Sequence, residues 1–158
     1  MPMSSSRRTM AAECPGVKLS VAPNPQEFSY RNYLADWSDW VGRGLVDEVV
    51  VQIYRWNRRG VEAELAHPSL ARARAKVPVR IGLLAGLRGR LKGGELLRRE
   101  LDLVGAGGLD GVDLFFYETA KLHFRGRRAP GREVFSGPAM TILPLTVAPP
   151  GPPAASSW

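Results

Sequence analysis

Residues 46–54, VDEVVVQIY, contain the apolar run on which the fold assignment depends. The run is rich in β-branched residues and alternates little between apolar and polar side chains, as is typical of a strand covered on both faces. Three further segments have the length and residue types of strands: VKLSVA at 17–22, VRIGLLA at 79–85 and GVDLFFY at 111–117. We therefore expect four strands.

Helical segments separate these strands. Residues 28–44, FSYRNYLADWSDWVGRG, predict one helix that Ser29 caps and Gly42 or Gly44 ends. Its apolar face is formed by residues at i, i+4, i+7 and i+11, namely Tyr30, Leu34, Trp37 and Val41. A second helical segment covers residues 59–76 with an interruption at His67-Pro68, and a third runs from Glu95 to Val104.

Strands joined by helices of this length are almost always parallel, with right-handed crossovers. The chain is therefore an α/β protein, and its sheet is either an open doubly wound sheet or part of a barrel. Periodicity alone leaves both open. A complete (β/α)₈ barrel takes about 250 residues, so four strands correspond to half of one.

Composition divides the chain of 158 residues into three regions. Residues 1–14 are expected to be disordered, residues 15–120 to form the βα units, and residues 121–158 to form a basic, Pro/Gly-rich, mostly disordered tail. Within that tail, the apolar stretch Met140 to Val147 is a candidate edge strand, although Pro144 interrupts it.

Charge and motifs exclude several classes of function. Much of the net charge of +7 lies in the tail, and the core has no nucleic-acid reader motif, so a nucleic-acid partner is not expected. One cysteine and two histidines cannot form a zinc site, and we expect neither a metal nor a cofactor. The Gly-rich segments at 86–94 and 105–111 match neither a P-loop nor a dinucleotide fingerprint.

Membrane and export signals are also missing from the pattern. No apolar run approaches the roughly 20 residues of a membrane helix. The N-terminal residues lack the apolar region of a secretory signal, so the sequence alone leaves the compartment unknown.

Candidate site residues follow the carboxyl ends of the predicted strands, where parallel α/β folds place their ligands. Glu118 immediately follows the fourth strand and is the best candidate for a catalytic carboxylate, the alternative being an acid that pairs with arginine or caps the next segment. Gln52 and Tyr54 share a face at the end of the second strand, and with Arg55 and Trp56 they offer hydrogen bonds and a stacking surface to a sugar. The alternative for Tyr54 is interior packing.

A basic loop follows the third strand. Arg88, Arg90 and Lys92 could meet an anionic group of a substrate there, or the loop is simply a solvated basic surface. No serine or cysteine sits in a nucleophile elbow, so the carboxylates remain the candidates for chemistry.

Several ordered segments resemble the C-terminal half of the glycosyl hydrolase-like 10 family, especially its cyanobacterial-type members. They are PNPQEFSYRNYLADWSDWVGRGLVDEVVVQIYR, then VPVRIGLLAGL, then GLDGVDLFFYET, and the similarity spans about residues 17–119. After Glu118 the family usually continues into a terminal helix, whereas this chain turns into Lys121-Leu-His-Phe and Pro-rich sequence.

The resemblance implies the C-terminal half of a (β/α)₈ TIM-type barrel and the hydrolysis of glycosidic bonds. It implies a polysaccharide or peptidoglycan glycan as substrate, and a cell-envelope or secreted location. Asn24 and Tyr117 lie in the matching pieces and join Gln52, Tyr54, Arg55 and Arg88 as expected substrate-binding residues.

The rival hypothesis is a non-catalytic glycan-binding or protein-interaction module derived from a half barrel. Half a barrel exposes strand edges and an apolar interior, which favours self-association or pairing with a complementary half barrel.

Overall fold

The computed structural model describes residues 2–124 and 140–142, and the fold is given for these residues. The helices are α1 (Pro2–Glu13), α2 (Gln26–Tyr33), α3 (Trp37–Gly42), α4 (Arg58–Leu65), α5 (Pro68–Arg74), α6 (Gly94–Ala106) and α7 (Tyr117–Phe124). The strands are β1 (Ser20–Val21), β2 (Glu48–Ile53), β3 (Val79–Leu84), β4 (Gly86–Leu87), β5 (Arg90–Leu91), β6 (Gly111–Phe115) and β7 (Met140–Ile142).

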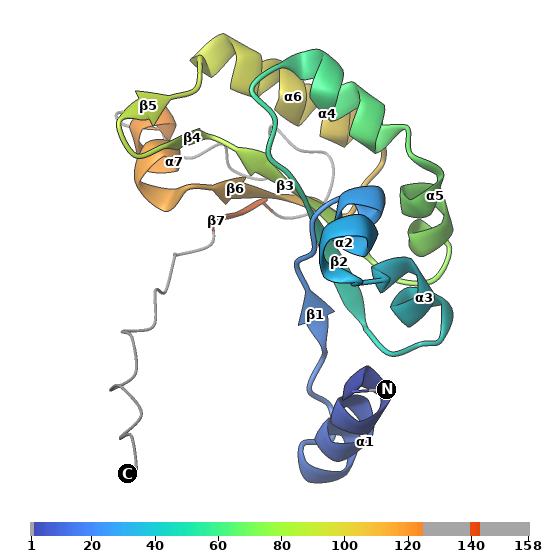
Figure 1. Ribbon diagram of the computed structural model, residues 1–158. Helices are drawn as coiled ribbons and strands as arrows, with labels where there is room; N and C mark the ends of the chain where they lie inside the picture. Colours follow the sequence, from blue (N-terminus) through green and yellow to red (C-terminus); the bar gives the residue numbers. More distant parts are fainter. Residues whose placement is uncertain (1, 125–139, 143–158) are drawn as a thin grey trace, which may run out of the picture.

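The main sheet is parallel and has the strand order β1-β2-β3-β6-β7 (Figure 1). β4 and β5 form a separate antiparallel hairpin between β3 and α6. The four predicted strands are therefore present, each shorter than its predicted segment. The prediction of an α/β fold with a parallel sheet is confirmed.

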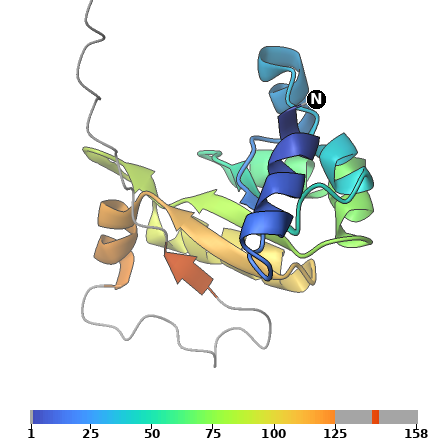
Figure 2. The ribbon, with the colours of Figure 1, turned by 90° about the horizontal axis from the view of Figure 1, so that it is seen from below.

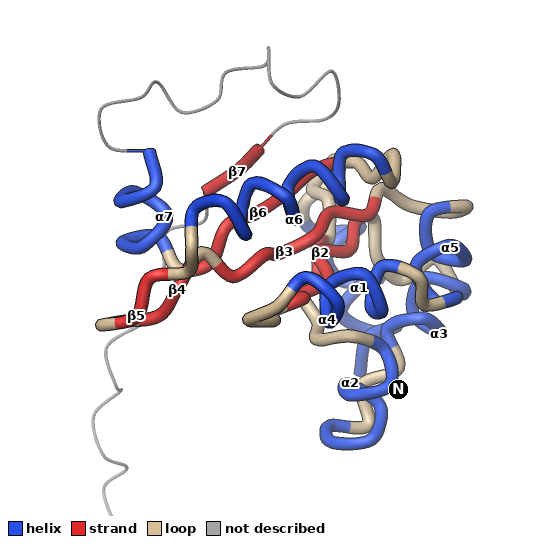
Figure 3. Tube along the Cα trace, turned by 90° about the horizontal axis from the view of Figure 1, so that it is seen from above, coloured by secondary structure: helices blue, strands red, loops and turns tan. Residues whose placement is uncertain are grey.

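Side chains of the central strands alternate between two environments. Val51 of β2, Ile81 of β3 and Val112 of β6 are aligned across the sheet and lie in the hydrophobic core. Helices α3, α4, α5 and α6 supply the other half of this core, through the buried residues Trp37, Val41, Val61, Leu70, Ala73, Leu97, Leu101 and Val104. Figure 3 shows α6 running along β3 and β6.

The opposite face of the sheet carries polar residues as well as the buried Val50 and Leu84. Arg80 of β3 forms an ion pair of 2.5 Å with Asp113 of β6, and Glu48 of β2 lies 3.7 Å from the same guanidinium group. In an open doubly wound sheet helices cover both faces, whereas in a (β/α)₈ barrel they cover only the outside. One-sided helices and strands paired in chain order are compatible with part of a TIM-type barrel.

The predicted helix at 28–44 is wrong in one respect, because the structure has two helices there. α2 ends at Tyr33 and is followed by Leu34, whose φ of 52° is left-handed. α3 begins after Asp36, whose side chain accepts a hydrogen bond from the Asp39 backbone N–H. The amide of Gln26 holds the break by donating to Asp36 and accepting from the Ser38 N–H. The expected apolar face is therefore divided.

The N-terminal residues differ from the expectation of disorder, since residues 2–13 form α1. Arg7 of α1 forms a bidentate ion pair with Asp47, which also accepts a hydrogen bond from the Leu19 N–H. These hydrogen bonds hold the pKa of Asp47 below its ordinary value. Seen from below, α1 lies on the β1 side of the molecule, away from α7 and the hairpin (Figure 2).

The C-terminal tail is only partly described. Residues 121–124 belong to α7, so the chain does continue into a helix after β6. Met140–Ile142 forms β7, parallel to β6, as the candidate edge strand predicted. The remainder of the predicted disordered tail lies outside the described residues.

The left-handed backbone at Leu34 predicts a stabilising substitution. Leu34 is 82% exposed, so Leu34→Gly removes little packing and relieves a conformation that costs an L-residue roughly 1–2 kcal/mol. After the extra entropy lost by glycine, we expect the free energy of unfolding in urea to rise by about 0.5–1 kcal/mol. Leu34→Ala is the control and should change it little; a less stable Gly variant would contradict the explanation.

Candidate functional site

The carboxyl ends of β1, β2, β3 and β6 lie at one edge of the parallel sheet, which we call the carboxyl edge. The predicted site residues follow these strands: Asn24 after β1, Gln52 to Arg55 at the end of β2, Arg88 in the hairpin after β3, and Tyr117 and Glu118 after β6. The sequence-based expectation of their placement at one edge agrees with this topology.

Gln52 and Asn24 connect β2 to the end of β1. The Gln52 side-chain amide donates to the Ala22 carbonyl at 2.8 Å, and its backbone N–H donates to the Pro23 carbonyl. The Asn24 carbonyl accepts from the Ser29 hydroxyl at 2.8 Å and from the Trp37 indole at 3.1 Å. Both residues therefore have structural contacts that fix the turn after β1.

Tyr54 lies over the sheet at the end of β2 and stacks on Phe115, with ring centroids 4.7 Å apart. Gly82 lies under this ring, and a Cβ atom added there would be 3.4 Å from the Tyr54 Cε1 atom, an ordinary van der Waals distance. Burial, and secondarily the negative charge of Asp113, raise the pKa of Tyr54 to about 12. Tyr54 is thus a packed, neutral phenol.

Arg55 joins the carboxyl edge to the helices behind it. Its guanidinium group forms an ion pair of 2.5 Å with Glu64 near the end of α4. Gly60 leaves space for the aliphatic part of the Arg55 side chain, whose Cγ atom would lie 3.1 Å from an added Cβ. The Arg55 carbonyl accepts a hydrogen bond of 2.8 Å from the Lys92 ammonium group.

Lys92 is the largest departure from the predicted basic loop. Its side chain is fully buried, and its ammonium group donates to the buried carboxylate of Glu100 in α6. Burial lowers the pKa of Lys92 and raises the pKa of Glu100, while the hydrogen bond between them opposes both shifts. Lys92 anchors the hairpin to α6 and to the end of β2, so it does not face a ligand.

The hairpin carries the other two basic residues on its surface. Arg88 is exposed in the turn between β4 and β5, next to Gly89, whose φ of 79° is left-handed. The Arg90 guanidinium group lies 4.1 Å from the centroid of the Trp56 ring, which is close enough for a cation–π interaction. Arg90 and Trp56 therefore cover each other at the carboxyl edge.

Glu118 lies in the first turn of α7 rather than directly after a strand, because β6 ends at Phe115. Its side chain is exposed. Tyr117 beside it is also exposed, and the Lys121 ammonium group lies 5.3 Å from its ring centroid. His123 anchors α7, with its Nε2 atom 2.9 Å from the Ala85 carbonyl at the end of β3.

The structure brings some of the predicted residues into contact and leaves others apart. Gln52 reaches the β1 end, and Tyr54 reaches the β6 end through Phe115. Among the described residues, Glu118 has no hydrogen bond or ion pair with the other candidates. Its place in the site rests on the topology of the sheet.

Sequence reasoning missed two buried ion pairs. Glu100 falls within the apolar spacing of α6 between Leu97 and Val104, and an acid at such a position signals a buried partner. Asp113 lies inside a strand whose other residues are apolar, which is a similar signal for its pairing with Arg80.

Two further properties concern metals and membranes. In the part of the chain that the structure describes, no three His, Cys, Asp or Glu side chains are grouped to hold a metal ion. No helix among the described residues is long and apolar enough to cross a membrane.

Parallel βα units with helices on one side and polar residues at the carboxyl edge are compatible with part of a TIM-type barrel. A model of the glycosyl hydrolase-like 10 family matches residues 3–94, more than half of the chain. The chain therefore belongs to the glycosyl hydrolase-like 10 family. No curated protein and no solved structure matches it.

The extent of the family match bears on the candidate residues. It includes nearly all of α1, which the sequence-based resemblance left out, and it ends at Gly94, the first residue of α6. Asn24, Gln52 and Arg88 lie inside the matched range, as do Tyr54 and Arg55. Tyr117 and Glu118 lie outside it.

The buried ion pair predicts a non-additive effect on stability. Lys92→Met leaves the Glu100 carboxylate buried without its partner, and we expect the free energy of unfolding to fall by about 3–5 kcal/mol. The double variant Lys92→Met with Glu100→Leu needs no charge compensation and should lose less than the single variant. Urea unfolding followed by tryptophan fluorescence measures both, and a double variant at least as unstable as Lys92→Met would contradict this.

The environment of Tyr54 predicts its titration. In an absorbance titration of phenolate at 295 nm, one of the four tyrosines should ionise at about pH 12, and Tyr54→Phe should remove that step. Asp113→Asn should lower its midpoint while leaving it above 10, because burial persists. Since the folded-state pKa is raised, this group stabilises the fold below pH 10 and its contribution is lost as the pH rises toward 12.

Proposed function

We propose that this chain acts on glycans through the carboxyl edge of its sheet, as the C-terminal half of a (β/α)₈ barrel that hydrolyses glycosidic bonds. Membership of the glycosyl hydrolase-like 10 family supports the substrate class. The one-sided covering of the sheet by helices supports the barrel. We infer that the substrate is a bacterial cell-wall or other polysaccharide.

The observation that carries the proposal is which of the glutamates that follow the strands are in ion pairs and which are not. Four of them are paired with arginine: Glu27 with Arg31 at 2.6 Å, Glu62 with Arg58 at 2.8 Å, Glu64 with Arg55 at 2.5 Å, and Glu95 with Arg99 at 3.0 Å. A fifth, Glu100, is paired with Lys92. Glu118 follows β6 and has no ion pair among the described residues. A carboxylate that no described arginine neutralises is available to exchange a proton with a substrate, so we assign the catalytic role to Glu118.

Substrate binding in this proposal uses polar and aromatic groups around Glu118. Tyr117 offers an exposed ring beside it, and Arg88 at the tip of the hairpin offers a flexible hydrogen-bond donor. Gln52 and Asn24 lie near the end of β1, where the Gln52 side chain donates to the Ala22 carbonyl and the Asn24 main-chain carbonyl accepts from Ser29 and Trp37. Tyr54 and Arg55 immediately follow β2, which lies between β1 and β3 in the sheet.

Glycoside hydrolysis requires a second carboxylate, at roughly 5–9.5 Å from the first depending on the stereochemical course. The other described glutamates that follow the strands are paired with arginine or, for Glu100, with lysine. In the proposal the second carboxylate belongs to the half of the barrel that completes the described sheet, supplied by another segment or by a partner chain.

The lack of a second unpaired glutamate after the described strands favours a second candidate function. A glycan-binding module without catalysis needs the polar and aromatic edge but no pair of carboxylates. Self-association or pairing with a complementary half barrel fits both functions, because β1 is an edge strand of the described sheet.

Replacement of Glu118 tests the catalytic role. With peptidoglycan glycan strands or chitin oligosaccharides as substrate, we expect Glu118→Gln to lower the rate of reducing-end release by about 100-fold or more. Glu95→Gln is a matched control, because Glu95 occupies the first turn of the preceding helix and is exposed, and its rate should stay within about twofold of the unmodified chain.

The outcomes of this experiment separate the two functions. Cleavage that survives Glu118→Gln unchanged removes Glu118 from the mechanism. A folded chain that binds the oligosaccharides but releases no reducing ends supports the glycan-binding module in place of the hydrolase.

A further inference from the structure

The break between α2 and α3 leaves large apolar side chains of α2 in solvent. Phe28 is 46% exposed, Tyr33 is 66% exposed, and Tyr30 and Leu34 are also exposed. The rings of Phe28 and Tyr33 contact each other edge to face, with centroids 5.9 Å apart. Within the described residues these two rings cover no core, so their exposure calls for an explanation.

Phe28 also lines an open pocket between α2 and the α4–α5 segment. The pocket has a volume of about 290 Å³, close to the lower end of the roughly 300–1,000 Å³ usual for small-molecule sites. Its lining is formed by Pro25, Gln26, Glu27, Phe28, Arg31, Asn32, Glu64 and His67. The space suits one small polar unit; Phe28 lines it, and the Tyr33 ring contacts the ring of Phe28.

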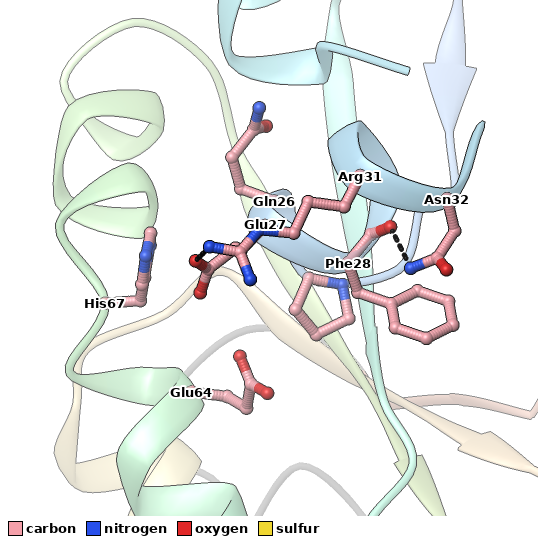
Figure 4. Close-up of a pocket in the computed structure, with 8 residues that line it drawn as sticks. Gln26, Glu27, Phe28, Arg31, Asn32, Glu64 and His67 are labelled. Carbon is pink, nitrogen blue, oxygen red and sulfur yellow. Dashed lines mark hydrogen bonds and ion pairs between the residues drawn. The ribbon is translucent and has the colours of Figure 1, made fainter. Parts of the chain in front are cut away.

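The charges around the pocket are balanced. Glu27 pairs with Arg31 at 2.6 Å, and Glu64 pairs with Arg55. Figure 4 shows the Glu27–Arg31 pair extending from α2 toward Glu64 and His67 on the opposite wall. A balanced lining favours an uncharged ligand over an anion or a cation.

Hydrogen-bonding groups remain available on both walls. On α2, the Asn32 amide donates its N–H to the Phe28 carbonyl, which leaves its oxygen free to accept within the described residues. On the opposite wall, the His67 Nδ1 atom contacts the Ser69 hydroxyl at 2.8 Å, while Nε2 has no contact with described residues. Each paired glutamate also keeps one carboxylate oxygen outside its ion pair.

We propose that this pocket, with the rings of Phe28 and Tyr33, is a second carbohydrate-binding site that takes one uncharged pyranose unit of a glycan. A pyranose has an apolar face that stacks on aromatic rings and hydroxyl groups that replace the hydrogen bonds of displaced water. An apolar protein surface is disfavoured, because it would desolvate the three charged side chains of the lining, Glu27, Arg31 and Glu64, without offering them hydrogen bonds. For the class of ligand, this inference rests on the proposed function.

Titration of the full chain with chitotetraose, and separately with cellotetraose, tests the site. We expect amide resonances of residues 26–34 and of His67 to shift in the NMR spectrum with at least one of these neutral probes. The double variant Phe28→Ala with Tyr33→Ala should bind that probe about five- to tenfold more weakly, given the stacking energy of two rings. Leu122→Ala, which truncates an exposed apolar residue on α7, is the matched control and should leave the affinity unchanged.

Asn32→Ala provides an independent variant, because Asn32 is exposed and lies on the pocket wall. It should also weaken binding, without altering the thermal unfolding of the chain. Shifts confined to the carboxyl edge, or an affinity unchanged in both the aromatic and the Asn32 variants, would overturn the proposal.

The outcome of this binding experiment is distinguishable from the outcome of the Glu118→Gln cleavage assay. Binding at residues 26–34 together with cleavage unaffected by Glu118→Gln would leave this site standing and remove the catalytic assignment. Loss of cleavage in Glu118→Gln with no sugar-induced shift on α2 would do the reverse. If the aromatic variant instead converts a dimer to a monomer in sedimentation, with sugar binding unchanged, the rings form a protein interface and the proposal fails.

Discussion

In β2, β3 and β6 every second side chain is an aliphatic residue that lies against the connecting helices. This packing of one face against the helices determines the rest of the fold, because each helix must return to the same face to cover the next strand. The other face is then left to residues such as Arg80 and Asp113, whose charges neutralise each other across neighbouring strands. The carboxyl ends of the strands consequently share one edge, and the candidate site lies there.

Much of the central architecture could be predicted from the sequence. The strands at 46–54 and 79–85 have continuous apolar runs, and His67-Pro68 correctly divides the two helices between them. These features are local, since a run of β-branched residues or a proline acts on the few residues around it.

The features that could not be predicted depend on contacts between distant residues. The apolar spacing at 28–44 fits an uninterrupted helix, and only the bonds from Gln26 to Asp36 and Ser38 show why it breaks. Helix α1 is associated with an ion pair between Arg7 and Asp47, which are 40 residues apart in the chain. At the site, the sequence predicts Lys92 to be a surface residue, because its buried partner Glu100 is known only from the structure.

The buried pair of Lys92 and Glu100 fixes the base of the hairpin but not its tip. At its base, the Lys92 ammonium group donates to Glu100 of α6 and to the main-chain carbonyl of Arg55, between β2 and α4. At its tip, Arg88 and Gly89 make no contact that the sheet requires. Changes in the length or charge of the tip are therefore expected to leave the strand ends in place, so the tip can vary without moving the candidate site.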